Sequence, residues 1–308
     1  MTLDDLRVFT AVCRTGSLSA AARELSCTQS AVSQHVKRLE REVGQTLLER
    51  HTRGVAPTPA GRLLQAAVTE GLGGIDDALR RLDELTQGDA GTVRVTTGAT
   101  TVRHFMSAAV ADFRRRFPRA GLEFQTETSS RGCFDALAAG GVDLAWITLG
   151  PAPGTVEQRA VVQLPWALAV CATDPLAGRA SVDPGDLQDA RLIGLPRNST
   201  SRRQLGAWLT ESGITPVFDT SVADWDTAIL LAELGLGHAV VPVLPAWLGP
   251  DHPDLRLIPL PALPALTAGW AARRWDALSP LALAFADTVA HHCGRGRTAT
   301  AVARPTVG

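Results

Sequence analysis

Residues 17–44, SLSAAARELSCTQSAVSQHVKRLEREVG, constrain the fold of this chain more than any other stretch. Ser17 or Ser19 can cap a short helix that ends near Leu25, and a polar break of three residues follows. Thr28 can cap a second helix, in which four apolar residues share one side: Val32, Val36, Leu39 and Val43. The segment therefore predicts two helices joined by a tight turn, with the apolar side of the second helix packed inward.

The other side of the second helix is polar and has two interpretations. Amides and hydroxyls come first and cations follow: Gln29, Ser30, Ser33, Gln34, Lys37 and Arg38. A solvated surface is the commoner role of such a side. A recognition helix would use the amides and hydroxyls on base edges and the cations on phosphates. Because an ordinary solvated helix alternates its charges and this side has no acid before Glu40, the composition favours a recognition helix.

A hairpin is predicted directly after this helix. Residues 47–50 and 55–57 have the pattern of two strands around a turn at 51–54. Arg50 and Arg53 lie near its tip, where a wing can reach a phosphate or a narrow minor groove. A solvated hairpin without a ligand is the alternative.

The stretch from Leu6 to Gly61 resembles the winged helix-turn-helix of the LysR-type transcriptional regulators. The resemblance has no gaps and rests on Phe9, Gly16-Ser17-Leu18, Ala21-Ala22, Leu25, Gln29-Ser30-Ala31-Val32-Ser33, Leu39-Glu40, Gly44, Leu47-Leu48, Glu49-Arg50 and Thr58-Pro59-Ala60-Gly61. Family members often have Pro, Phe and Leu where this chain has Ser30, Leu48 and Ala56. The resemblance implies a DNA-binding domain over residues 1–57, in which Gln29, Ser30, Ser33 and Gln34 approach bases and Lys37, Arg38, Arg50 and Arg53 contact the backbone.

Residues 58–87 are predicted to form one long helix. Thr58 and Pro59 suit its first turn, and apolar residues recur at near-heptad spacing: Leu64, Val68, Leu72, Ile75, Leu79, Leu82 and Leu85. Such a seam favours pairing with a second copy of the chain, although packing onto its own domain is the alternative. In the resembled family this helix is the dimerisation element and dimers often pair into tetramers, which implies a pseudo-palindromic operator.

The pattern changes after a short hinge at residues 88–92. Short apolar strands then alternate with amphipathic helices over residues 93–292, which predicts βαβ units and mostly parallel sheets. The last residues, 293–308, have no periodicity and are expected to be disordered.

Residues 93–292 resemble the effector domain of the same family, which is similar to a type II periplasmic solute-binding protein. The matching landmarks are GATT at 98–101, FRRRFP ending at Pro118, GVDLA at 141–145, DPLAG at 174–178, Leu187, Leu192-Ile193 and GLGHAVVP ending at Pro242. The implied chain is an α+β multi-domain protein with two α/β lobes around a cleft. Lobe I spans about 93–162 and 267–292, and lobe II about 163–266.

Small molecules in α/β proteins bind beyond the carboxyl ends of strands, where helix starts favour carboxylates. The candidate residues at such positions are Thr100, Thr101, Ser129, Ser130, Thr148, Asn198, Ser199, Thr200, Asp226 and Thr227; Thr148 comes from the resemblance. A plain helix cap is the alternative for each hydroxyl. Together they predict a site for a small carboxylate effector, aided by Arg131 or Arg202. Asp224 and Asp226 would oppose an anion and suit an amine instead.

Composition and motifs exclude several other classes. There is no apolar run of membrane length and no signal-peptide pattern, so we expect a cytoplasmic protein. The five cysteines form neither a disulfide framework nor a zinc motif, and a cysteine redox switch or a metal site at His291-His292-Cys293 has little support. No catalytic motif is present, and a secreted solute-binding protein would leave the first 87 residues unexplained.

The sequence thus predicts a DNA-binding regulator that is not an enzyme and has no cofactor or metal. Its expected partners are double-stranded DNA, a second copy of itself, a small-molecule effector and RNA polymerase. The net charge of −1 conceals an uneven distribution: residues 1–62 carry nine bases and six acids, a net of +3. We therefore expect modest nonspecific DNA affinity, with specific binding that depends on dimerisation and base contacts.

Overall fold

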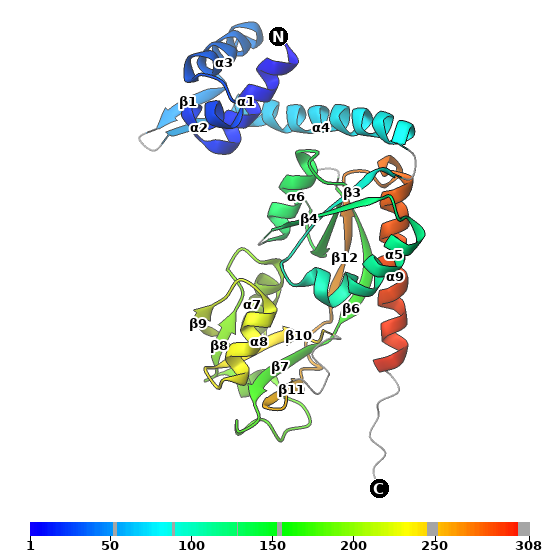
Figure 1. Cartoon of the computed structure of the whole chain (residues 1–308). Helices are drawn as coiled ribbons and strands as arrows, with labels where there is room; N and C mark the ends of the chain where they lie inside the picture. The colour runs from blue at the N-terminus through cyan, green and yellow to red at the C-terminus, as the bar shows by residue number, and fades with distance from the viewer. Residues whose placement is uncertain (52–53, 88–89, 128, 153–155, 245–251, 301–308) are drawn as a thin grey trace. The chain divides into compact units, whose positions relative to one another are not determined.

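The computed structural model describes residues 1–51, 54–87, 90–127, 129–152, 156–244 and 252–300, and its helices and sheets form an α+β architecture (Figure 1). The chain divides into two compact units, and the division falls inside the long helix α4 (Pro59–Gln87), between Asp83 and Glu84. Arg53 of the predicted wing and residues 88–89 of the predicted hinge lie outside the described residues. No described helix has both the length and the apolarity needed to cross a bilayer.

The first unit contains a helix-turn-helix followed by a hairpin. Its elements are α1 (Leu3–Thr15), α2 (Leu18–Glu24), α3 (Gln29–Val43), β1 (Leu48–His51), β2 (Gly54–Pro57) and α4. Ser17 caps α2 by accepting from the Ala20 N–H at 3.3 Å, and Thr28 caps α3 by accepting from the Ala31 N–H at 3.2 Å. Both caps agree with the sequence prediction, and Ser17 rather than Ser19 is the one used.

The apolar side of α3 packs against α1, α2 and the hairpin. Val32 and Leu39 are fully buried, and Leu39 packs with Phe9 of α1 and with Leu47 before β1. Val43 is 40% exposed, so the last residue of the predicted stripe is not buried. It is the final residue of α3, and the chain leaves the helix at Gly44, where φ is 70°.

Helix α4 begins as predicted, because Thr58 Oγ1 accepts from the Gly61 N–H at 3.0 Å. A Cβ on Gly61 would overlap the carbonyl oxygen of Leu47, so the start of α4 is in close contact with the hairpin. Further along, the seam residues that remain exposed are Ile75 at 41%, Leu79 at 54% and Leu82 at 60%. Their own domain does not cover them.

Lobe I of the second unit has a five-stranded sheet in the order β4-β3-β5-β12-β6. Its elements are β3 (Thr92–Thr97), η2 (Val102–Met106), α5 (Ser107–Arg116), β4 (Gly121–Thr126), α6 (Ser130–Ala138), β5 (Leu144–Thr148), β6 (Glu157–Leu164), β12 (Leu266–Ala272), η5 (Trp275–Ala277) and α9 (Pro280–Thr300). Leu144 and Trp146 of β5 belong to the core that includes α5 and α9, whereas Ala145 and Ile147 pack with α6. The sheet is therefore covered on both faces, as Figure 1 shows.

Lobe II has a second five-stranded sheet in the order β11-β7-β10-β8-β9. Its elements are β7 (Trp166–Cys171), η3 (Pro184–Leu187), β8 (Arg191–Gly194), α7 (Thr200–Glu211), β9 (Val217–Ser221), α8 (Trp225–Glu233), β10 (His238–Pro242) and β11 (Leu255–Pro259). Leu205 and Leu209 bury one side of α7, and Ile229 does the same for α8.

The prediction of mostly parallel sheets is confirmed for strand direction, because four of the five strands in each sheet run the same way and one strand, β12 in lobe I or β7 in lobe II, runs against its neighbours. In lobe I, β3 is parallel to β4 and β5; in lobe II, β8 is parallel to β9 and β10. Every antiparallel pair of these sheets involves β7 or β12, the strands that adjoin the passages between lobes. A strand-helix alternation indicates local elements, but it does not indicate the direction of a strand that returns from another lobe.

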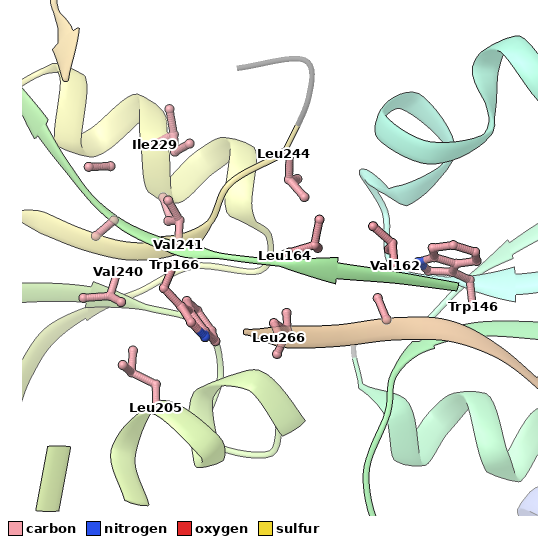
Figure 2. Close-up of a cluster of buried hydrophobic side chains, with 14 of the residues drawn as sticks. Trp146, Val162, Leu164, Trp166, Leu205, Ile229, Val240, Val241, Leu244 and Leu266 are labelled. Carbon is pink, nitrogen blue, oxygen red and sulfur yellow. The ribbon is translucent and has the colours of Figure 1, made fainter. Parts of the chain in front are cut away.

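Two passages of chain connect the lobes. The first runs from β6, which ends at Leu164, into β7, which begins at Trp166, and the second leads back into β12. Leu164 pairs with Leu266 of β12, and both are 4% exposed. Figure 2 shows these two leucines between Val162 and Trp146 of lobe I and Trp166 of lobe II. One apolar core therefore continues across the crossing.

Helix α9 continues to Thr300, so the predicted disorder from residue 293 is wrong for residues 293–300. Cys293 packs against the apolar core, and its thiol lies 3.9 Å from the Phe105 carbonyl oxygen. Backbone hydrogen bonds propagate a helix beyond the last apolar repeat where no proline stops it. Residues 301–308 lie outside the described residues.

Candidate nucleic-acid interface and interlobe cavity

The polar side of α3 is open to solvent. Gln29, Ser30, Gln34 and Lys37 are exposed, and Ser33 is half-buried. The opposite side of the helix is held by the Val32 and Leu39 contacts, so the polar residues project from a fixed support. Arg50, on β1, is also exposed. The structure thus presents together the α3 residues that the sequence predicts as DNA contacts.

Arg38 is bound to a buried carboxylate of α1. Its Nε donates to Asp5 Oδ1 and Oδ2 at 2.9 and 3.0 Å, and its second terminal nitrogen also donates to Oδ1. Asp5 is fully buried, and His35 Nδ1 lies 2.8 Å from Asp5 Oδ1. The Arg38 hydrogen bonds outweigh the opposing effect of burial and, with His35, hold the pKa of Asp5 well below its usual value.

The Asp5–Arg38 ion pair links α3 to α1. This structural role was not predicted from the sequence, which indicated Arg38 only as a contact to the DNA backbone. Asp5 also accepts from the Thr2 N–H at 2.8 Å, which completes a capping box at the start of α1. From the sequence, the capping box alone explains Asp5. No local signal links it to a residue 33 positions away.

A cavity of about 290 Å³ lies between the two lobes, with lining residues from both. Seven of the ten predicted effector residues line it: Thr100, Thr101, Ser129, Ser130, Thr148, Ser199 and Thr200. These positions come from separate turns, so the topology brings together hydroxyls that are far apart in the sequence. The volume is near the lower end of the range for small-molecule sites.

Three predicted residues do not line the cavity. Asn198 is exposed and precedes Ser199, which is the actual cap of α7. Asp224, and neither of the candidates Asp226 and Thr227, is the cap of α8, and Thr227 donates to Asp224 from both its N–H and its hydroxyl. Asp226 lies 2.7 Å from Nε2 of His104, a buried histidine on η2 of lobe I.

Sequence reasoning missed the aromatic residues of the cavity and one of its two acids, Glu127. Phe105, Trp146 and Trp225 contribute rings, and the Phe105 and Trp146 centroids are 5.3 Å apart. Glu127 also lines the cavity, as does Asp224, which the sequence analysis names as an acid that would oppose an anion. The strand DLAWIT offered one available signal, because Trp146 is two residues before the predicted Thr148 and points to the same side of the strand.

Neither arginine that was predicted to aid a carboxylate lines the cavity. Arg131 is exposed and pairs with Asp135 at 3.1 Å, one turn further along the same helix. Arg202 lies over the ring of Phe218, and burial, together with nearby Arg197, lowers its pKa to about 10. Among the described lining residues there is no basic side chain.

Cys133 lines the same cavity as a buried thiol. Burial raises its pKa to about 11, and the charge of Glu127 acts in the same direction. A thiol with so little thiolate is a weak nucleophile at neutral pH. Within the described residues there is no group of three or more histidine, cysteine or acidic side chains placed to hold a metal ion.

Two family models account for nearly all of the chain. The model for bacterial regulatory helix-turn-helix proteins of the lysR family matches residues 3–62, and the model for the LysR substrate binding domain matches residues 86–294. The chain belongs to the LysR family of bacterial transcriptional regulators. It is a DNA-binding regulator with an effector-binding domain, as the sequence predicts.

LysR-family relatives match along most of their length. The RuBisCO operon transcriptional regulator of Allochromatium vinosum is 28% identical over 299 residues, which cover 96% of this chain and 97% of that protein. The probable RuBisCO transcriptional regulator of Emiliania huxleyi is 31% identical over 217 residues, 69% of this chain and 68% of that protein. The family consists of regulators, and a solute-binding protein would not account for the match at residues 3–62.

Solved structures share the fold. A full-length OxyR variant from Pseudomonas aeruginosa superposes with a TM-score of 0.65 at 23% identity and covers 94% of each chain. Full-length CbnR complexed with its target DNA gives 0.55 at 21% identity and covers 95% of this LysR-family chain and 100% of CbnR.

Proposed function

We propose that this regulator binds a pseudo-palindromic operator in double-stranded DNA as a homo-oligomer, with one α3 in each half-site. The exposed polar side of α3 on a buried apolar support carries this proposal. Residues at the start of the helix approach base edges: Gln29, Ser30, Ser33 and Gln34. Cations further along the helix and on the hairpin contact the DNA backbone: Lys37, Arg50 and Arg53. Arg38 contributes less to DNA contact, because its side chain is hydrogen-bonded to Asp5.

A matched pair of substitutions tests the α3 assignment. Gln29→Ala should change the preferred operator sequence, because an amide on a base edge carries sequence information. Lys37→Ala should weaken binding to all sequences alike and reduce the slope of log affinity against log salt by about 1. Gel shifts of the full chain on an operator library at several salt concentrations measure both. Unchanged preference for Gln29→Ala would remove α3 from base recognition.

The oligomer is proposed to form along α4. Ile75, Leu79 and Leu82 are exposed on one chain, and a partner helix would bury this apolar surface. Leu79→Glu should therefore dissociate the oligomer, as measured by size-exclusion chromatography with light scattering. Ala66→Glu is the control, since Ala66 is exposed and lies off the seam. Equal effects of the two variants would contradict pairing through the seam.

The interlobe cavity is proposed to bind a small carboxylate effector without converting it chemically. The start of α7 supports this, because Ser199, Thr200 and Ser201 are buried there and the first N–H groups of a helix favour an anion. An effector that contacts both lobes would favour one lobe arrangement and change the bending or half-site spacing of the operator. Contact with RNA polymerase and action in the cytoplasm complete the proposal.

Calorimetry of the full chain with a metabolite panel tests the effector proposal. Carboxylates should bind and should change the gel-shift pattern on the operator. Binding by neutral or cationic compounds alone would contradict the carboxylate.

A further inference from the structure

Two acids line the interlobe cavity, and they differ in the hydrogen bonds that their carboxylates already make. Asp224 accepts from the Thr227 N–H at 2.8 Å and from the Thr227 hydroxyl at 3.1 Å, so both of its oxygens serve the start of α8. Glu127 is half-buried, and within the described part of the chain its carboxylate has no hydrogen bond or ion pair. Glu127 is thus the acid of the cavity that remains available to a ligand.

The position of Glu127 also decides which helix start can take an anion. Its carboxylate lies against Gly132 in the first turn of α6, so closely that a Cβ on Gly132 would overlap Oε2. The positive end of α6 therefore already faces a negative charge, and Asp224 does the same for α8. A second anion at either start would meet a like charge.

Helix α7, in contrast, has no acidic residue at its cap or in its first turn. Its cap is the neutral Ser199, whose hydroxyl accepts from the Arg202 N–H at 3.3 Å. Thr200 lines the cavity and is only 8% exposed, and its hydroxyl makes no hydrogen bond with the described residues. The hydroxyl oxygen is not fully enclosed by protein, so it is open to a ligand or to water in the cavity. This hydroxyl and the free N–H groups beside it suit a carboxylate.

We infer that the effector is an amino carboxylate, with its ammonium on Glu127 of lobe I and its carboxylate at the start of α7 in lobe II. Between these ends the cavity is apolar and aromatic, with Trp146 and Leu164 among its lining residues. A zwitterion satisfies both charge preferences at once, and a dicarboxylate would set its second charge against Glu127. Because opposite ends of the ligand bind different lobes, its binding favours the arrangement in which both are within reach. The inference rests on the proposed effector role of this cavity.

A series of ligands with one apolar body separates the two charges. A thermal-shift screen of the standard amino acids against the full-length chain comes first. The probes are then phenylalanine, 3-phenylpropionate and phenethylamine. If another amino acid stabilises the chain more than phenylalanine does, its deaminated and decarboxylated analogues form the equivalent series. We expect the zwitterion to bind at least tenfold more tightly than the analogue without the ammonium and the analogue without the carboxylate.

The outcomes distinguish this inference from the proposed function. Equal affinity for the zwitterion and its deaminated analogue overturns the ammonium at Glu127 and leaves a carboxylate effector standing. Binding by the amine alone overturns the carboxylate as well. Binding by dicarboxylates without any amino acid, or no response to any amino acid, also overturns the inference.

Glu127→Gln provides the second test. It should reduce affinity for the amino acid at least tenfold, to that of the deaminated analogue, whose own affinity should not fall. A merely structural role of Glu127 would weaken both ligands alike. Glu123→Gln is the control, because Glu123 is exposed on the same segment of chain, in β4, and pairs with Arg94 at 3.1 Å. Circular dichroism checks that both variants are folded.

Discussion

Asp5→Asn is expected to destabilise the N-terminal unit selectively. Asparagine keeps an oxygen for the Thr2 N–H but removes the charge that accepts the Arg38 hydrogen bonds. A hydrogen bond to a charged group contributes about 1.5–3 kcal/mol. The Arg38 side chain is 44% exposed, so water screens part of each bond. We therefore expect the free energy of unfolding to fall by about 2 kcal/mol in total, which is about the contribution of one unscreened bond of this kind.

The pH dependence follows from the lowered pKa of Asp5. The carboxylate stabilises the fold fully at pH values above the unfolded-state pKa of about 4. This contribution is lost as the pH falls through the lower pKa of the folded state. The difference between the native chain and Asp5→Asn should therefore be constant between about pH 5 and 7 and should shrink below about pH 4.

The distribution of tryptophans makes the assay selective. All seven lie at Trp146 or later, so fluorescence reports on the effector-binding domain while circular dichroism also reports on α1 and α3. With a urea dependence of about 1 kcal/mol per molar, a loss of about 2 kcal/mol shifts the first dichroism transition by roughly 2 M. Asp4→Asn removes the same charge from an exposed residue and should shift it by less than about 0.5 M. Equal shifts for the two variants, or a shift in fluorescence of similar size, would refute the reasoning.

Three further predictions concern other parts of the chain. Arg53→Ala should weaken DNA binding at all sequences and flatten its salt dependence by about one unit in gel shifts; an unchanged slope would remove its phosphate role. Gly61→Ala should destabilise α4 by about 1–3 kcal/mol through overlap with the hairpin. Gly71→Ala, with open space around it, should instead stabilise by about 0.5–1 kcal/mol, and thermal unfolding compares the two. Iodoacetamide at about pH 8 should alkylate exposed Cys27 well before Cys133, whose pKa is raised to about 11, and peptide mass spectrometry would expose the reverse order.

The helix-turn-helix could be predicted from sequence because its determinants are local. Ser17, Thr28 and Thr58 each cap the helix that they precede, and the burial of Val32 and Leu39 follows from helical spacing. The Asp5–Arg38 pair could not be predicted, since its members lie on different helices. Local patterns place elements, and contacts between elements require the fold.

The same distinction between local patterns and contacts made by the fold applies to the residues of the cavity. Thr100, Ser129 and Ser199 were predictable because strand ends and helix starts are local features that the topology gathers at one cleft. The one reversed strand in each sheet, β12 in lobe I and β7 in lobe II, was not predictable, because each follows a passage between the lobes. Glu127 was missed because one acid after a strand has no distinctive pattern, and its importance comes from the absence of bases among the described lining residues.

The acids at helix starts show how far local position determines chemistry. The carboxylate of Asp224 accepts hydrogen bonds as the cap of α8. Asp226 is hydrogen-bonded to His104, a residue of the other lobe that is 122 positions away in the chain. Glu127 lies against the start of α6 yet keeps its carboxylate on the cavity. In the sequence, all three are acids near the start of a helix. Only their contacts in the fold distinguish the cap Asp224, the interlobe contact Asp226 and the proposed ligand contact Glu127. In the proposed amino-carboxylate site, the ammonium pairs with Glu127 because this acid has no hydrogen bond or ion pair among the described residues, so the proposed specificity of the cleft depends on it.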